Sequence, residues 1–225
     1  AVTALVAVGV GVAAQHPAPP QPPAAVGVVA AGPELPVHQR RNSPAPASPT
    51  PARPDAAGHR EPAAPRAPAA LDYSRPVRVS IPRINVSSTL VDLGLDPEGV
   101  METPQDPAKA GWFTPSPPPG IPGASVIAGH VTWDQQPAVF FRLGDLRRGD
   151  KVRVSRADGS TAVFAVYRLG QFPKNAFPTK AVYRHTDQPE LRLITCGGLY
   201  NEETNSYRAN LIVWARMVSQ QHTHR

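Results

Sequence analysis

From residue 77 onward, apolar and polar residues follow one another in short, regular runs. Residues 77–81 read Val-Arg-Val-Ser-Ile, the period of two that a half-buried strand shows, and Pro82 restricts that strand to an edge or an end. Two apolar runs at 124–128 and 191–195 have the length of strands, and the second reads as a buried one. A further strand is expected over 207–213. The pattern therefore predicts a chain of short strands.

Turn signals separate these strands. Asp158-Gly159 lies between the apolar runs 149–155 and 162–167, a combination typical of a β-hairpin. Residues 96–99, Asp-Pro-Glu-Gly, form a second expected turn, and the proline-rich stretch 114–123 is expected to be a rigid surface loop that leads into a strand.

Helical periodicity is scarce in the same region. Only residues 136–146 have room for a helical turn or two. Six to eight short strands without long helical periods predict an all-β protein, with a closed or nearly closed antiparallel barrel as its architecture.

Composition divides the chain into a spacer and a folded part. The chain has 29 prolines, and 15 of them fall between residues 15 and 70, mixed with Ala, Ser and scattered Arg. Such a stretch cannot bury enough apolar surface to offset its ordering entropy. We expect a disordered or polyproline-like linker at 15–75, a folded domain at 76–218 and a short tail at 219–225.

The first fourteen residues are apolar or small and carry no charge. A membrane-spanning helix needs about 20 such residues, so we expect residues 1–14 to be the remnant of a signal anchor. A cleavable signal peptide is the first alternative, and an Ala/Val-rich disordered tail is the second. Both signal interpretations place the folded domain outside the cytoplasm, at the cell membrane and envelope.

The chain is basic, with a formal net charge of +6 and a pI near 9.9. Its cations are dispersed, and no cluster alternates with aromatic residues as a single-strand nucleic-acid binder requires. We therefore expect general attraction to an anionic cell envelope and no nucleic-acid partner.

The candidate chemistry lies at the ends of apolar strands. Cys196, the only cysteine, directly follows the run 191–195 and precedes Gly197-Gly198. A lone cysteine is either an inert core residue or a reactive thiol, and two glycines beside it allow close approach of a backbone. His130 comes at the end of the strand segment Val-Ile-Ala-Gly-His at 126–130, and Arg208 follows Cys196 by twelve residues. A thiol, an imidazole and a guanidinium are the parts of a cysteine transacylase.

Three motifs, Ile-Thr-Cys-Gly-Gly at 194–198, Ile-Ala-Gly-His-Val at 127–131 and Tyr-Arg-Ala-Asn-Leu-Ile-Val at 207–213, together resemble the sortases. The resemblance covers about residues 76–218. The sequence segments 111–113 (Gly-Trp-Phe) and 144–150 (Gly-Asp-Leu-Arg-Arg-Gly-Asp) are similar to those of the actinobacterial class F and class E sortases, and class F is the nearer of the two. The resemblance to the sortases implies an eight-stranded β-barrel and a cysteine transpeptidase that cleaves an LPXTG-like sorting signal between Thr and Gly. The acyl group then passes to an amine of the peptidoglycan precursor.

The resemblance also implies roles for individual residues. Cys196 attacks as a thiolate, His130 gives a proton to the departing amine and takes one from the incoming amine, and Arg208 stabilises the oxyanion or binds the substrate backbone. Thr195 either supplies an oxyanion donor or packs at the strand end. His185 is expected to be a loop residue without a catalytic part.

Some sortases bind calcium through a carboxylate-rich loop before the cysteine strand, and this chain lacks such a loop. The stretch 171–190 holds only two carboxylates, Asp187 and Glu190, beside three cations, whereas a hard cation needs several oxygen ligands. We expect no metal, no other cofactor and a monomer.

Two other classes of protein remain open at this stage. L,D-transpeptidases also use an exported Cys and His on a β scaffold, although their histidine lies close before the cysteine in a Ser-His-Gly-x-Cys-like pattern that is missing here. The second alternative is a non-catalytic, wall-binding β module in which Cys196 is an inert core residue.

Overall fold

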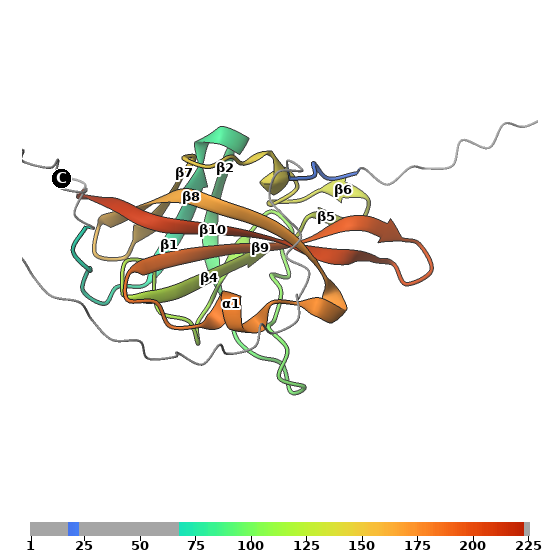
Figure 1. Ribbon diagram of the computed structural model, residues 1–225, viewed down its shortest axis with the longest axis horizontal. Coiled ribbons are helices and arrows are strands. Elements are labelled where there is room, and N and C mark those ends of the chain that lie inside the picture. Colours follow the sequence, from blue (N-terminus) through green and yellow to red (C-terminus); the bar gives the residue numbers. More distant parts are fainter. Residues whose placement is uncertain (1–17, 23–67, 223–225) are drawn as a thin grey trace, which may run out of the picture. The chain divides into compact units, whose positions relative to one another are not determined.

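The computed structural model describes residues 18–22 and 68–222, and eight strands close a barrel in the order β1-β2-β3-β4-β9-β10-β8-β7 (Figure 1). This confirms the expected eight-stranded barrel. The barrel strands are β1 Pro76–Ile81, β2 Val86–Leu93, β3 Ala110–Phe113, β4 Gly123–Gly129, β7 Lys151–Arg156, β8 Ser160–Pro173, β9 Pro189–Asn201 and β10 Ser206–His222.

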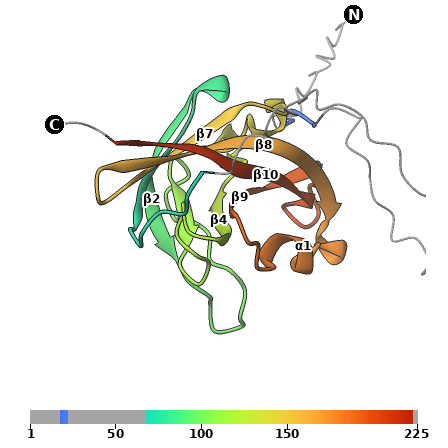
Figure 2. The same cartoon turned by 60° about the vertical axis from the view of Figure 1, so that its left-hand side comes forward.

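Two further strands and four short helices lie outside this ring of strands. A small separate sheet consists of β5 Thr132–Trp133 and β6 Gln136–Pro137. The helical segments are η1 Pro82–Ile84, η2 Leu143–Asp145, η3 Lys174–Ala176 and α1 Thr179–Tyr183. Helix α1 lies outside the barrel wall (Figure 2). Among the described residues, no helix has the length and apolar character that crossing a bilayer would require.

The barrel is mixed, which corrects the expectation of an antiparallel one. Strands β2 and β3 pair in parallel, and so do β4 and β9, while the other neighbours pair antiparallel. Parallel neighbours need a crossover of a dozen or more residues. Residues 94–109 form one such crossover, and the long excursion at 130–188 forms the other.

Helical content is the second point where sequence and structure differ. The stretch 136–146 does contain η2, as expected, but η1, η3 and α1 were not expected. Each of these segments has only three or five residues. Such lengths are too short for a 3.6-residue period to become visible in the pattern of apolar residues.

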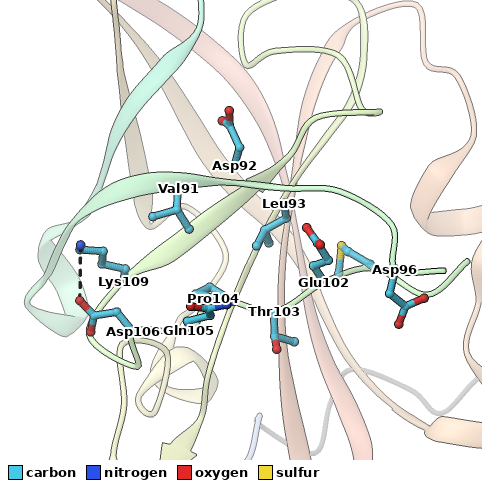
Figure 3. Close-up of a pocket in the computed structure, with 11 residues that line it drawn as sticks. Val91, Asp92, Leu93, Asp96, Glu102, Thr103, Pro104, Gln105, Asp106 and Lys109 are labelled. Carbon is cyan, nitrogen blue, oxygen red and sulfur yellow. Dashed lines mark ion pairs between the residues drawn. The ribbon is translucent and has the colours of Figure 1, made fainter. Parts of the chain in front are cut away.

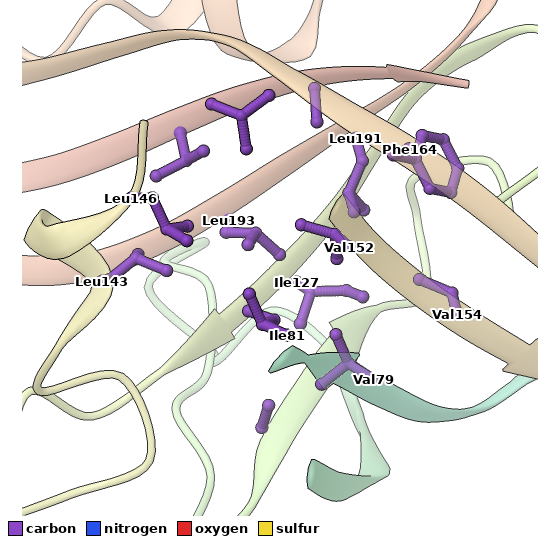
Figure 4. Close-up of a cluster of buried hydrophobic side chains, with 14 of the residues drawn as sticks. Val79, Ile81, Ile127, Leu143, Leu146, Val152, Val154, Phe164, Leu191 and Leu193 are labelled. Carbon is purple, nitrogen blue, oxygen red and sulfur yellow. The ribbon is translucent and has the colours of Figure 1, made fainter. Parts of the chain in front are cut away.

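The sheet has apolar side chains on both of its faces near β4 and β9. Inside the barrel, Ile127 packs with Leu191 and Leu193 (Figure 4). On the outer face, a second cluster contains Val126, Ala128 and Ile194. Successive residues of a strand point to opposite faces, so a strand that is covered on both sides has apolar residues directed to both of them. This explains why apolar residues adjoin one another in the runs 124–128 and 191–195, whose polar members are Ser125, Arg192 and Thr195.

The packed region begins before the expected boundary at Pro76. The backbone N–H of Leu71 donates to the carbonyl of Gly120 at 2.8 Å, and the buried guanidinium of Arg156 donates to the carbonyl of Asp72. The expected anchor at 1–14 and most of the expected linker at 15–75 lie outside the described residues.

A buried ionic network crosses the outer face of β9. Glu190 and Arg192 are 6% and 1% exposed, and their side chains form an ion pair of 2.7 Å. The same carboxylate accepts a hydrogen bond of 2.8 Å from the hydroxyl of Tyr167 and lies 3.6 Å from Arg216. Burying one partner of such a pair without the other leaves an uncompensated charge.

We therefore predict that Glu190→Ala lowers the free energy of unfolding by about 3–5 kcal/mol, because Arg192 would stay buried without its counter-ion. Urea denaturation measures this. Glu202→Ala, at an exposed carboxylate in the turn after β9, is the matched control and should change stability by less than about 0.5 kcal/mol. Equal effects of the two substitutions would contradict the prediction.

Candidate active site

The parallel register of β4 and β9 brings His130 and Cys196 together. Its last pair is Ala128 with Ile194, and both side chains belong to the outer apolar cluster. His130 and Cys196 each lie two residues further along, so alternation directs them to the same outer face. Both line a single hollow of about 640 Å³. The structure thus brings together two of the residues that the sequence singled out.

Cys196 does not end its strand, although the sequence suggested an end there. Strand β9 continues to Asn201, and β10 stays paired with it up to Ser206. The pairing with β4 ends at Ile194. Strand β8 stays paired with β10 as far as Ala209, the register partner of Gly197. Beyond that pair β9 and β10 form a two-stranded ribbon that extends past the barrel (Figure 1), and the half-buried thiol lies just before its base.

The glycine pair after the thiol has a conformational role. Gly198 has φ +78°, a conformation that side chains with a Cβ rarely adopt, and a Cβ there would lie 3.0 Å from the Cβ of Ala209. The register of β9 against β10 shifts at this position. Gly198 therefore allows the irregular turn of the ribbon just beyond Cys196.

The ring of His130 is fixed from two sides. Its Nε2 lies 2.7 Å from the carbonyl oxygen of Pro104. A carbonyl only accepts hydrogen bonds, so Nε2 carries a proton and Nδ1 is the nitrogen that gains or loses one. The ring of Trp133 meets the histidine ring edge to face, with centroids 4.9 Å apart. Pro104 of the loop 94–109 and Trp133 of β5 together fix the orientation of the imidazole, so that Nδ1 is the nitrogen available for proton transfer.

The crossover loop 94–109 that supplies Pro104 is held by its own carboxylates. Asp96, Glu102 and Asp106 accept backbone N–H bonds of 2.7 to 2.9 Å from within or beside the loop, and these residues surround a hollow next to β2 (Figure 3). Across residues 18–22 and 68–222, no group of three or more His, Cys, Asp or Glu is placed to hold a metal ion. Glu190, one of the two carboxylates considered for a metal, is engaged with Arg192.

Two opposing influences set the acidity of the thiol. Burial raises the pKa of Cys196 above its ordinary value, and the positive charge of Lys174 on η3 offsets part of that rise. The first influence is the larger. At neutral pH the resting site therefore holds mainly the thiol, with the reactive thiolate as a minority form.

Arg208 and Thr195 lie outside the lining of this hollow. Arg208 is exposed and makes no ion pair with a described residue. It precedes Asn210, the register partner of Cys196, by two residues, so alternation along β10 places it on the same face as the thiol. Thr195 is buried, and its hydroxyl has no hydrogen-bond partner among the described residues. The roles of both residues stay predictions. His185 lies in the exposed loop after α1, where it was expected.

Among the lining residues to which sequence reasoning gave no role, Trp133, Lys174 and Tyr207 make contacts that bear on the site. Trp133 contacts His130, Lys174 acts on the thiol, and Tyr207 accepts a hydrogen bond of 3.1 Å from the hydroxyl of Thr132. Trp133 lies three residues after His130, just beyond the motif at 127–131, and was detectable there as an aromatic residue close to the histidine. Lys174 is far from Cys196 in sequence, and only the fold reveals their proximity.

A family model described as the sortase domain matches residues 79–218 of this chain. The matched span contains His130, Cys196 and Arg208. Among the curated proteins no significant match is found.

Known sortase structures share the fold. Sortase A of Listeria monocytogenes is 16% identical, with a TM-score of 0.50 over 67% of this chain and 92% of that one. Sortase C of Streptococcus pneumoniae is 18% identical, with a TM-score of 0.50 over 68% of this chain and 71% of that one. At these identities the likeness concerns the barrel alone.

We predict that Lys174→Gln raises the pKa of the Cys196 thiol further, because the substitution removes the charge that favours the thiolate. The rate of alkylation by a small neutral reagent, measured against pH, should rise at higher pH than in the unchanged protein. Lys180→Gln removes the same charge from α1, outside the hollow, and should leave the profile unchanged. A profile that Lys174→Gln does not move would exclude this role for Lys174.

Proposed function

Since this chain belongs to the sortase family of cysteine transpeptidases, we propose that it cleaves an LPXTG-like sorting signal between Thr and Gly. The acyl group would pass through a thioester on Cys196 to an amine of the peptidoglycan precursor. The observation that carries this proposal is the convergence of His130 and Cys196 on one face of two paired strands, in one hollow.

The proposed acylation begins with the thiolate. The sulfur of Cys196 attacks the Thr carbonyl carbon, a C–S bond forms, and the C–N bond to Gly breaks. Protonated His130 gives the Nδ1 proton to the departing amine, while Nε2–H stays bonded to Pro104. Acid–base assistance of this kind is worth about 10²- to 10⁴-fold in rate.

Deacylation reverses the proton transfer. The acceptor amine attacks the thioester carbonyl and loses a proton to neutral Nδ1 of His130, and the thiolate leaves as the new amide forms. Because Pro104 holds the opposite nitrogen, the same ring atom serves both half-reactions without a flip of the imidazole. Trp133 helps to keep the ring in that orientation through its edge-to-face contact.

Arg208 is the proposed partner of the developing negative charge. Its guanidinium is always charged and presents a planar fork of donors, which suits an oxyanion together with a backbone carbonyl. Two observations support the proposal: the side chain is exposed without an ion pair to a described residue, and alternation along β10 places it on the face of the thiol.

An envelope location follows from this chemistry, because sorting signals and peptidoglycan precursors meet outside the cytoplasm. We propose that residues 1–14 contribute to membrane attachment and that the proline-rich stretch at 15–70 acts as a spacer. Because the chain belongs to the sortase family, the alternative of an L,D-transpeptidase is set aside. A non-catalytic wall-binding module stays the contrary outcome of the tests below.

We predict that Cys196→Ala abolishes the acyl-enzyme, because the chain contains no second thiol. Mass spectrometry after incubation with an LPXTG peptide should show an adduct on the unchanged protein and none on the variant. Thermal unfolding serves as the control for folding and should change little, because Cys196 is only half-buried. An adduct that persists in the variant would refute the assignment, and a lack of adduct on both proteins would favour the non-catalytic module.

For Arg208→Lys we predict a loss of turnover of roughly 10²-fold or more, the scale of losing one oxyanion donor, with little change in melting temperature. Peptide cleavage and thermal unfolding are measured in parallel. Arg153→Lys, on β7, is the matched control and should keep full turnover. If turnover of Arg208→Lys stays near that of the unchanged protein, Arg208 is not catalytic, and a parallel loss of stability would assign it a structural role.

A further inference from the structure

A second hollow, of about 730 Å³, lies where α1 approaches β8 and β10. It shares no lining residue with the hollow around the thiol. Four of its nine lining residues are cations, and none is a carboxylate. We call it the basic hollow, and its four cations are Arg168, Lys180, Arg184 and Arg192.

Two of these cations are held by the fold. The guanidinium of Arg168 lies over the ring of Trp214, 4.5 Å from its centroid, and Trp214 in turn donates a hydrogen bond of 3.4 Å to the carbonyl of Ala181 on α1. A guanidinium stacked on a ring keeps its N–H groups free at the edge. Arg192 is fixed by its bonds to Glu190 and to the carbonyl of Leu191.

Arg192 has a donor without a partner. The residue is 1% exposed, and its Nε is buried with no acceptor among the described residues. Buried N–H groups are almost always hydrogen-bonded, and each exception calls for an explanation, of which a bound ion is one. Because Arg192 also lines the basic hollow, an anionic oxygen seated against it is the acceptor that the fold does not provide.

The charges around the hollow do not balance. Glu190 is the carboxylate nearest to Arg192, and it is already shared with Arg216 and Tyr167. Arg168, Lys180 and Arg184 form no ion pair with a described residue. Like charges gathered without counter-ions raise the local positive potential and attract an anion.

We propose that the basic hollow binds a phosphoryl group, either as free phosphate or on a lipid headgroup. Several oxygens on one centre match several guanidinium and ammonium donors, which a single carboxylate matches less well. The cations converge on one hollow and do not extend along a stripe, so the geometry favours a compact anion over a nucleic-acid strand.

This inference goes beyond the proposed peptide transfer and does not depend on it. Arg192 and Cys196 lie on the same face of β9, four residues apart, which corresponds to roughly 13 Å along a strand. A phosphoryl group in the basic hollow would therefore be anchored beside the catalytic hollow without entering it. Binding can be measured on the whole chain without any peptide substrate.

The test compares two double variants that lose the same charge. Lys180→Gln with Arg184→Gln removes two exposed cations of the basic hollow. Lys151→Gln with Arg153→Gln removes two cations from β7, and neither of these lines the basic hollow. Calorimetric titration with inorganic phosphate tests the free anion. Co-sedimentation with phosphatidylcholine vesicles, with or without phosphatidylglycerol, tests the headgroup.

We expect the first variant to bind at least about tenfold more weakly than the unchanged chain, since charge-assisted hydrogen bonds are lost, while the β7 variant binds normally. Binding in the phosphate arm alone identifies a free anion, and much tighter binding in the vesicle arm identifies a headgroup. The proposal is overturned if neither probe binds, if both variants lose affinity equally, or if the first variant binds unchanged. Melting temperatures close to that of the unchanged chain verify that both variants fold.

Discussion

Strands β4 and β9 pair in parallel from Gly123 with Pro189 to Ala128 with Ile194, and the relative position of His130 and Cys196 depends on this register. In a parallel pair, equal steps along both strands keep two side chains level and on the same face. His130 and Cys196 are each two steps past the last pair. A shift of one residue in either strand would turn one of the two groups into the barrel.

The register in turn depends on apolar packing on both faces of the sheet. Ile127 and Leu193 fill the barrel, while Val126 and Ile194 pack outside it against the segment that includes α1. The outer face also buries the ion pair of Arg192 with Glu190. A buried pair is costly to desolvate and adds little stability on its own, although removal of one partner would leave the other charge buried without compensation.

The barrel and the central pair of groups were predictable because they leave local signals. Largely apolar runs at 124–128 and 191–195 indicated strands, the second of them buried. His130 follows the first run by two residues, and Cys196 directly follows the second. The parallel pairing was not predictable, because nothing in a strand's own sequence states which neighbour it meets across a long crossover. For the same reason, the contact of Pro104 with His130 and the effect of Lys174 on Cys196 were not predictable, because each joins residues that are far apart in the sequence.

Burial and charge act in opposite directions on the thiol, and their balance suits a transpeptidase. Because burial dominates, the pKa of Cys196 is raised and the resting sulfur is mostly protonated, a form that reacts slowly with oxidants and stray electrophiles. The nearby positive charge of Lys174 offsets part of this rise in the pKa and so favours formation of the thiolate. His130, held through Nε2 by the loop carbonyl, offers Nδ1 to the proton that must move. In the proposed reaction, Cys196 is therefore protected as a thiol at rest and becomes the reactive thiolate when one proton leaves the sulfur.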